Sequence, residues 1–146
     1  MTLVYDRDSI TYDDSLYGEI HITPLSVNFI SFVESLGGKV KENHLLPENG
    51  IETNQQFHYA ISFPTTRYSY SIIKGGGSYG RDKDLFELAV LCDDHCCYDT
   101  DITDDVIGYL EEEDLYAMVR LLLRLDEDGH IRPLTAIESS QNERLV

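Results

Sequence analysis

The sequence feature that most constrains the fold is a pair of strand-like stretches between Arg67 and Cys92. Residues 68–72 (YSYSI) alternate large apolar with small polar side chains, and a period of two is typical of a half-buried strand. Residues 85–91 (LFELAVL) form a short, mostly apolar run, which indicates a more deeply buried strand. A glycine-rich turn separates the two stretches. The pattern therefore predicts a β-hairpin over residues 67–92.

Other strand-like stretches precede and follow this hairpin. Residues 57–63 (FHYAISF) also alternate and stop at Pro64, and a short turn then leads directly into the hairpin. Three consecutive strands joined by short turns favour an antiparallel meander. Shorter β-like pieces are residues 3–5, 19–22 and 96–98, whereas residues 39–56 have the composition of a loop or a ragged edge.

The first of two predicted helices spans residues 24–36. Thr23 suits the N-cap, and Pro24 suits the first helical position, where its missing N–H is no loss. Apolar residues follow at spacings of three and four, and Gly37 with Gly38 suits the left-handed end of a helix.

The second predicted helix spans residues 112–125, because its apolar residues also recur at helical spacing. Its leucines extend the apolar surface beyond one face, so the helix is either deeply buried or covered by a partner. The apolar positions are Leu115, Met118, Val119, Leu121, Leu122, Leu123 and Leu125.

These elements predict an α+β fold, an antiparallel sheet of four to five strands with the two helices packed on one face. The chain has 146 residues, enough to bury a core without disulfides, so we expect a single domain over residues 1–146. Within it, residues 1–66 hold the N-terminal strands, helix and loop, and residues 67–125 hold the hairpin, an acidic segment and the second helix. Residues 131–146 are expected to be a partly frayed tail.

The charge of the chain is strongly negative, with 27 acidic and 11 basic residues and a formal net charge of −16. An acidic surface can serve solubility alone, or it can face a partner with a positive surface. Nucleic acids and anionic membranes are bound by basic surfaces, which this composition does not supply. We therefore expect no direct binding to nucleic acid or to membranes.

The negative charge is concentrated after the hairpin, since Lys83, Arg120 and Arg124 are the only bases between residues 82 and 128. Carboxylates in the first turn of a helix complement its dipole, but this explanation does not cover those that precede the helix. We predict that the segment is a partner-binding surface. Its carboxylates are Asp93, Asp94, Asp99, Asp101, Asp104, Asp105, Glu111, Glu112, Glu113 and Asp114.

Closely spaced carboxylates can imitate a line of phosphates. Proteins that bind DNA grip its phosphates with grooves lined by arginine and lysine, and a dense acidic surface could enter such a groove. Binding of this kind is fast and is weakened by salt. The hypothesis is that the chain mimics nucleic acid toward a basic nucleic-acid-binding protein.

A glycine cluster and a cysteine cluster could carry chemistry, but neither matches a known site. Gly75, Gly77 and Gly80 have the G-x-G-x-x-G spacing beside Lys74, yet a strand follows where a dinucleotide site needs a helix, so we interpret them as a wide, flexible hairpin tip. Tyr79 and Arg81 at that tip could touch a partner.

The three cysteines, Cys92, Cys96 and Cys97, are an odd number and two are adjacent, which does not suggest a disulfide framework. Their spacing is unlike that of structural zinc sites, so we expect buried, apolar cysteines and no metal or other cofactor. No nucleophile, metalloprotease or phosphate-loop motif is present, and the chain is not expected to be an enzyme.

One further pattern lies in residues 68–73, 78–80, 85–91, 98–100 and 102–110. In these residues, within roughly the segment 68–125, the chain resembles small acidic proteins of bacteriophage genomes. The resemblance implies a viral accessory protein, a class that includes anti-CRISPR and anti-restriction inhibitors. The implied partner is a Cas or restriction nuclease in the host cytoplasm.

The leading hypothesis is therefore a non-enzymatic inhibitor whose acidic surface occupies the basic groove of a host defence nuclease. The alternative is a structural or assembly protein that homo-oligomerises through the apolar helix 112–125, as a homodimer through residues 115–125. A third hypothesis is a metal-assisted enzyme that uses the Cys92–Cys97 cluster. No apolar run approaches the ~18–20 residues of a membrane helix, and residues 1–6 lack the features of a signal peptide. Because the cysteines do not suggest a disulfide framework, we expect a cytoplasmic protein.

Overall fold

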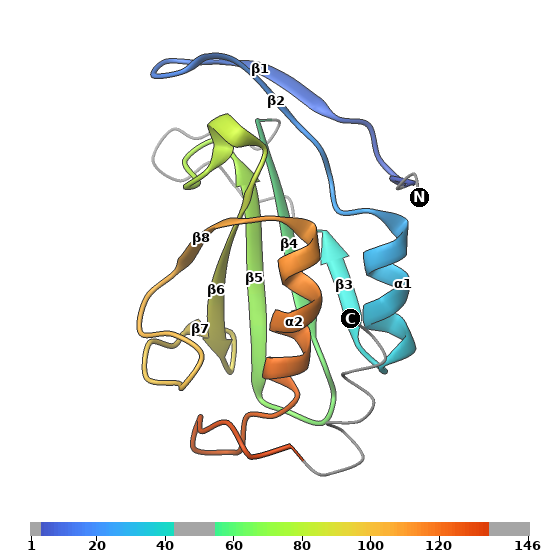
Figure 1. Ribbon diagram of the computed structural model, residues 1–146, viewed down its shortest axis with the longest axis vertical. Helices are drawn as coiled ribbons and strands as arrows, with labels where there is room; N and C mark the ends of the chain where they lie inside the picture. Colours follow the sequence, from blue (N-terminus) through green and yellow to red (C-terminus); the bar gives the residue numbers. More distant parts are fainter. Residues whose placement is uncertain (1–3, 43–54, 135–146) are drawn as a thin grey trace.

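The computed structural model describes residues 4–42 and 55–134, and the predicted hairpin lies at the centre of its main sheet (Figure 1). Strands β5 (Tyr68–Gly75) and β6 (Phe86–Cys92) pair antiparallel, with Tyr70 opposite Val90. Strand β4 (Gln56–Ser62) pairs with the other edge of β5. The predicted antiparallel meander is thus confirmed.

Three short strands extend this sheet. Strand β3 (Lys39–Glu42) pairs with β4, while β7 (His95–Cys96) and β8 (Ile107–Leu110) both pair with β6. The described residues therefore form a six-stranded sheet, larger than the four to five strands predicted. Residues 39–42 were expected to be a loop or a ragged edge, and they form the edge strand of the sheet, because their backbone pairs with β4. The rest of that predicted loop, residues 43–54, lies outside the described residues.

A separate hairpin precedes the first helix. Strands β1 (Ile10–Asp14) and β2 (Gly18–Ile22) form a two-stranded antiparallel sheet, which lies across one end of the main sheet (Figure 1). The short 3-10 helix η2 (Arg81–Lys83) in the β5–β6 loop contacts β2.

The two helices, α1 (Val27–Ser35) and α2 (Glu112–Leu122), cover the same face of the main sheet (Figure 1). Alternation places Tyr68, Tyr70 and Ile72 on the covered face, where they are at most 4% exposed. The Tyr70 hydroxyl donates to the Met118 carbonyl at 2.6 Å. The α+β class and the packing of both helices against the antiparallel sheet are confirmed.

The first helix begins three residues later than predicted, with Ser26 instead of Thr23 as its N-cap. Ser26 Oγ accepts the Phe29 N–H at 3.2 Å. Thr23 cannot act as the cap because its N–H and hydroxyl both donate to Asp84, at 2.7 and 2.9 Å. The predicted end is correct, since the Gly37 and Gly38 N–H groups donate to carbonyls of the last turn.

The second helix ends at Leu122 instead of Leu125. Residues 123–125 form a tight turn, and Leu125 then pairs in an isolated bridge with Ile131. The start of the tail is therefore bonded to the chain near α2, whereas residues 135–146 lie outside the described residues. No helix in the described part of the chain is both long and apolar enough to cross a membrane.

Candidate functional site

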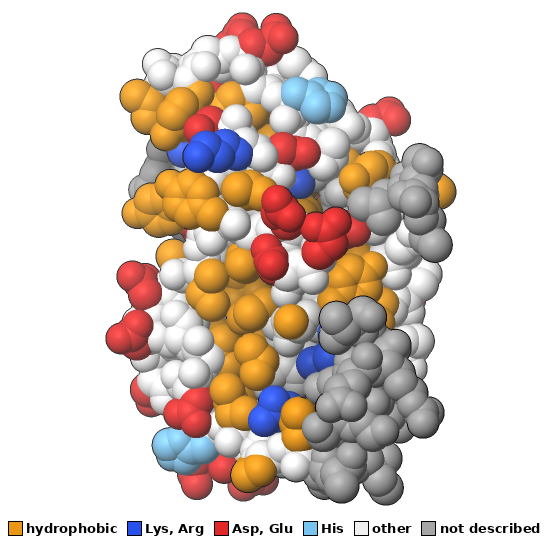
Figure 2. Space-filling model, viewed as in Figure 1, with side chains coloured by type: hydrophobic (Ala, Val, Ile, Leu, Met, Phe, Trp, Pro, Cys, Tyr) orange, Lys and Arg blue, Asp and Glu red, His pale blue; other side chains and the backbone are white. Residues whose placement is uncertain are grey.

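The acidic segment borders the helix-covered side of the molecule in three places (Figures 1 and 2). Asp93 and Asp94 form the turn between β6 and β7, both with positive φ, which aspartate tolerates. The loop of residues 97–106 carries the next four aspartates, and the last four carboxylates lie at the N-terminus of α2. Figure 2 shows acidic side chains at the start of α2 and along the edge of the loop, with an apolar strip between them.

The carboxylates at the start of α2 have different roles. Glu112 accepts the backbone N–H and the hydroxyl of Ser26 at 2.7 and 2.6 Å, and so joins α2 to α1. Asp114 accepts the Glu111 N–H at 2.9 Å, which caps the helix. Glu113 is exposed, and its carboxyl beside Glu111 raises the pKa of Glu111. Part of this cluster therefore stabilises the fold, and Glu113 remains available to a partner.

The carboxylates of the loop also divide into structural and exposed groups. Asp101 accepts the Ile131 N–H at 2.9 Å and pairs with His130 at 3.3 Å, and these contacts hold the pKa of Asp101 below its usual value. Asp105 accepts the Val106 N–H, and Asp99 accepts the Cys97 thiol. Asp94 and Asp104 are exposed and make no hydrogen bond or ion pair within the described residues.

Few of the ten predicted contact carboxylates are neutralised by a basic group. In the described chain only Asp93 and Asp101 lie within 4.0 Å of one, at 3.9 Å from Arg67 and 3.3 Å from His130, which leaves eight of ten without such a partner. The arginines nearest in sequence have other contacts. Arg120 lies over the Phe32 ring, and Arg124 donates to the Arg132 carbonyl.

Three further carboxylates, Asp126, Glu127 and Asp128, were not among the predicted contact residues. All three are exposed. Their turn lies beside the acidic loop, since the Asp101 N–H donates to the Gly129 carbonyl at 2.8 Å. The run of acids is visible in the sequence. Its contact with the loop is not, because α2 separates the two segments in the sequence.

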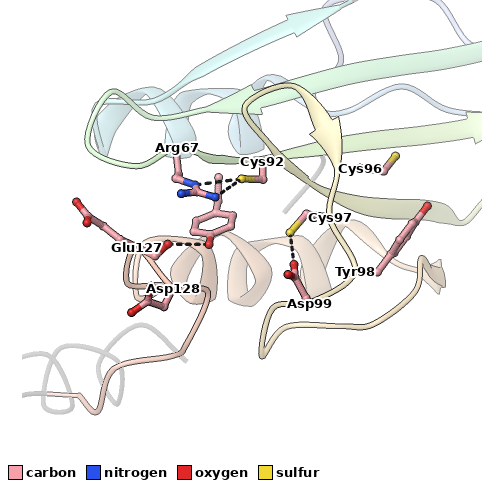
Figure 3. Close-up of a pocket in the computed structure, with 9 residues that line it drawn as sticks. Arg67, Cys92, Cys96, Cys97, Tyr98, Asp99, Glu127 and Asp128 are labelled. Atoms are coloured by element: carbon pink, nitrogen blue, oxygen red, sulfur yellow. Dashed lines mark hydrogen bonds between the residues drawn. The ribbon is translucent and has the colours of Figure 1, made fainter.

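The cysteines line one end of an open cavity of about 710 Å³, together with Arg67, Tyr68 and residues of the turn after α2 (Figure 3). Cys92 Sγ accepts from Nε and Nη2 of Arg67 at 3.0 and 2.8 Å. Cys97 donates to Asp99 at 2.8 Å, and this bond raises the pKa of Cys97. Cys96 points away from Arg67 and Cys97, as Tyr98 does (Figure 3).

The expectation of buried, apolar cysteines is therefore wrong. Cys96 is exposed, and Cys92 and Cys97 are half-buried with polar partners, because β7 is a short edge strand near the surface. Within residues 4–42 and 55–134, no three histidine, cysteine or acidic side chains are grouped so that they could hold a metal ion.

The glycine-rich loop is a hairpin tip, as predicted, but it is packed against its surroundings, whereas a wide, flexible tip was expected. Ser78 is fully buried and closes the turn by bonding to both backbone groups of Gly75. Lys74 is 2% exposed and donates to Asp84 and to the Thr23 carbonyl, both at 2.9 Å. These contacts occupy the lysine, so the loop does not present it to a phosphate.

The apolar side chains of α2 are mostly used inside the molecule. Leu115, Val119 and Leu122 are fully buried, and no residue of 112–125 is among the exposed large hydrophobic side chains of the described chain. The wide apolar surface seen in the sequence is thus explained by packing on the sheet, on α1 and on the turn that follows.

Comparison of the chain with protein-family models, with curated proteins and with solved structures finds no match.

Proposed function

We propose that this chain is a non-enzymatic inhibitor whose acidic surface occupies the basic nucleic-acid groove of another protein. That protein would be a host defence nuclease of the kind that anti-CRISPR or anti-restriction proteins inhibit. The observation that carries the proposal is that eight of the ten predicted carboxylates have no cationic partner in the described chain. Uncompensated negative charge repels itself and costs stability, and a cationic partner would offset that cost.

The contacts narrow the set of carboxylates that could meet a partner. Those that hold the fold are Asp101, Asp105, Glu112 and Asp114. The exposed carboxylates Asp94, Asp104 and Glu113 can bind a cation without breaking an internal hydrogen bond to another residue's backbone. Glu127 and Asp128, which line the cavity beside Cys97, extend the same surface.

Mimicry of a phosphate line makes a specific demand on the energetics of binding. Each carboxylate that meets an arginine or lysine releases counterions, so affinity should fall steeply as salt rises. Duplex DNA and this chain should also compete for the same groove. These two properties separate a nucleic-acid mimic from an inhibitor that binds elsewhere on the nuclease.

The test uses purified restriction and CRISPR-associated nucleases, each loaded with a fluorescent DNA duplex. The chain should displace the duplex from at least one nuclease, and the triple variant D94K/D104K/E113K should fail to do so. The matched control D8K/D13K/E19K makes the same change in net charge on and beside the β1–β2 hairpin, and it should displace the duplex as the wild type does. The proposal is wrong if the chain displaces DNA from none of them, or if both triple variants lose activity equally.

A further inference from the structure

Two exposed tyrosines lie together where β8 passes the β5–β6 loop, an edge where Figure 2 shows hydrophobic side chains at the surface. Tyr79 and Tyr109 are 60% and 57% exposed. A methyl group added at Gly108 would lie 2.8 Å from Cβ of Tyr79, and one added at Gly80 would lie 3.3 Å from Cα of Tyr109. Each tyrosine therefore packs against the glycine next to the other.

Tyr109 is held at this edge in an unfavourable backbone conformation. Its φ of +60° lies in the left-handed region, which a bulky residue rarely adopts. Strand β8 has a bulge here, since Phe86 pairs with Leu110 and Leu88 pairs with Ile107. Because the Tyr109 side chain is exposed, its burial in the core does not offset this backbone strain. Strained residues cluster at functional sites.

A half-buried carboxylate completes the cluster. Glu87 lies opposite the bulge, and its Oε1 accepts the Tyr79 N–H at 3.1 Å. Burial, with a smaller effect from the charge of Asp105, raises the pKa of Glu87. No basic group lies within 4.0 Å of Glu87 in the described chain. A carboxylate in this state is stabilised by any cation that approaches it.

We infer that Tyr79, Tyr109 and Glu87 form an arginine-binding contact, in which a guanidinium group of the partner lies on a tyrosine ring and donates to the Glu87 carboxylate. Arginine suits this arrangement better than lysine, because its planar group stacks on aromatic rings and donates two parallel hydrogen bonds to a carboxylate. The inference rests on the proposed function and names the partner side chain that this part of the surface would receive.

The acidic neighbourhood excludes other occupants of the same rings. A nucleic-acid base could stack on a tyrosine, but its phosphates would be repelled by Glu87, by Asp105 and by the nearby start of α2. An apolar partner would bury the Glu87 carboxylate without a charge partner, which is unfavourable. A cationic, planar group satisfies both the rings and the carboxylate.

The test compares two peptides of equal charge, nine arginines and nine lysines, by fluorescence anisotropy in low salt. The wild type should bind the arginine peptide about fivefold more tightly, the size expected of one exposed cation–π contact. The variant Y79A/Y109G should lose this preference and keep its affinity for the lysine peptide. Glycine fits the left-handed position of Tyr109, so the variant should fold. The control Y17A removes an exposed tyrosine from the β1–β2 turn and should bind both peptides as the wild type does.

The inference is overturned if the wild type shows no preference for arginine, or if Y79A/Y109G keeps it. It is also overturned if that variant weakens both peptides equally. The triple variant D94K/D104K/E113K distinguishes the two proposals, because it should weaken both peptides through charge alone. If it does so while Y79A/Y109G binds both peptides like the wild type, the proposal of an acidic binding surface is supported and the proposal of an arginine contact is wrong.

Discussion

Lys74 is a charged side chain within the core, 2% exposed, and its environment explains how that charge is tolerated. Its ammonium group donates to Asp84 and to the Thr23 carbonyl, and lies 3.8 Å from the centre of the Phe86 ring. Burial lowers the pKa of Lys74, and the charge of Asp84 opposes that shift. Asp84 also binds Thr23, so one carboxylate joins the glycine-rich loop to the segment before α1.

Neutralising Asp84 should therefore be costly. We expect D84N to lower the free energy of unfolding by about 2 kcal/mol, less than for a fully buried pair because Asp84 is partly exposed. Asparagine tolerates the left-handed backbone of Asp84, so the substitution changes mainly the charge. Urea denaturation measures the effect, and D82N, which alters an exposed neighbour, should change stability by less than about 0.5 kcal/mol. Equal effects of the two substitutions would show that the pair does not stabilise the fold.

The contact between His130 and Asp101 predicts a pH dependence. The hydrogen bond that the His130 ring donates to the Asp101 carboxylate, with the charges of Asp101, Asp126 and Asp128, raises the pKa of His130 in the folded chain. A raised pKa means that this contact stabilises the fold fully below the unfolded value of about 6.5 and ceases to do so as pH rises through the folded value.

The stability difference between wild type and H130Q should therefore be larger at pH 5.5 than at pH 8.5. Thermal unfolding at the two pH values measures this difference. In an NMR titration, the pKa of His130 should be higher in the wild type than in D101N. A His130 titration that D101N leaves unchanged would contradict the assignment of the shift to Asp101.

Among the elements, the two helices are joined by one polar contact between their N-termini. Ser26 caps α1 and also donates twice to Glu112, a residue of the first turn of α2. We expect S26A to lower the free energy of unfolding by about 1–2 kcal/mol, because it removes a cap and a hydrogen bond to a carboxylate. S15A, at an exposed turn position, is the matched control. In a double-mutant cycle, S26A and E112Q should be non-additive, and strict additivity would show that the contact contributes nothing.

The elements that sequence reasoning predicted well are those with a strong local pattern. The alternation in residues 68–72 identified the central strand, and Gly37 identified the end of α1. The start of α1 could not be predicted, because Thr23 bonds to Asp84, 61 residues away. Strands β3 and β8 have no clear period of two, and their pairing with β4 and β6 alone defines them.

The same limit applies to the candidate site. The sequence identified the acidic residues, but it could not tell which of them hold the fold, because the partners of Glu112 and Asp101 lie in distant segments. The sequence also gave no sign that Tyr79 and Tyr109, which are 30 residues apart, lie together. Tyr79 packs against Gly108, and Tyr109 packs against Gly80.

At the scale of the whole molecule, charge and apolar surface are separated in a way that bears on self-association. Segment 93–128 holds 13 of the 27 acidic residues, and α2, whose apolar face is buried, lies within it. A second copy approaching α2 would bring the same acids against themselves. Stable dimers bury roughly 1,200–2,000 Å² and have an apolar interface centre, whereas no residue of α2 is among the exposed large hydrophobic side chains of the described chain.

We therefore expect a monomer in sedimentation velocity at both 0.1 M and 1 M NaCl. Salt screens repulsion between copies and would strengthen a hydrophobic dimer, so 1 M NaCl is the condition that favours the alternative of assembly through residues 115–125. A dimer at 1 M NaCl that L121K abolishes and K83A retains would establish that alternative, since Leu121 is a half-buried residue of α2 and Lys83 lies outside it. A monomer under both conditions leaves the acidic surface free for a different, cationic protein.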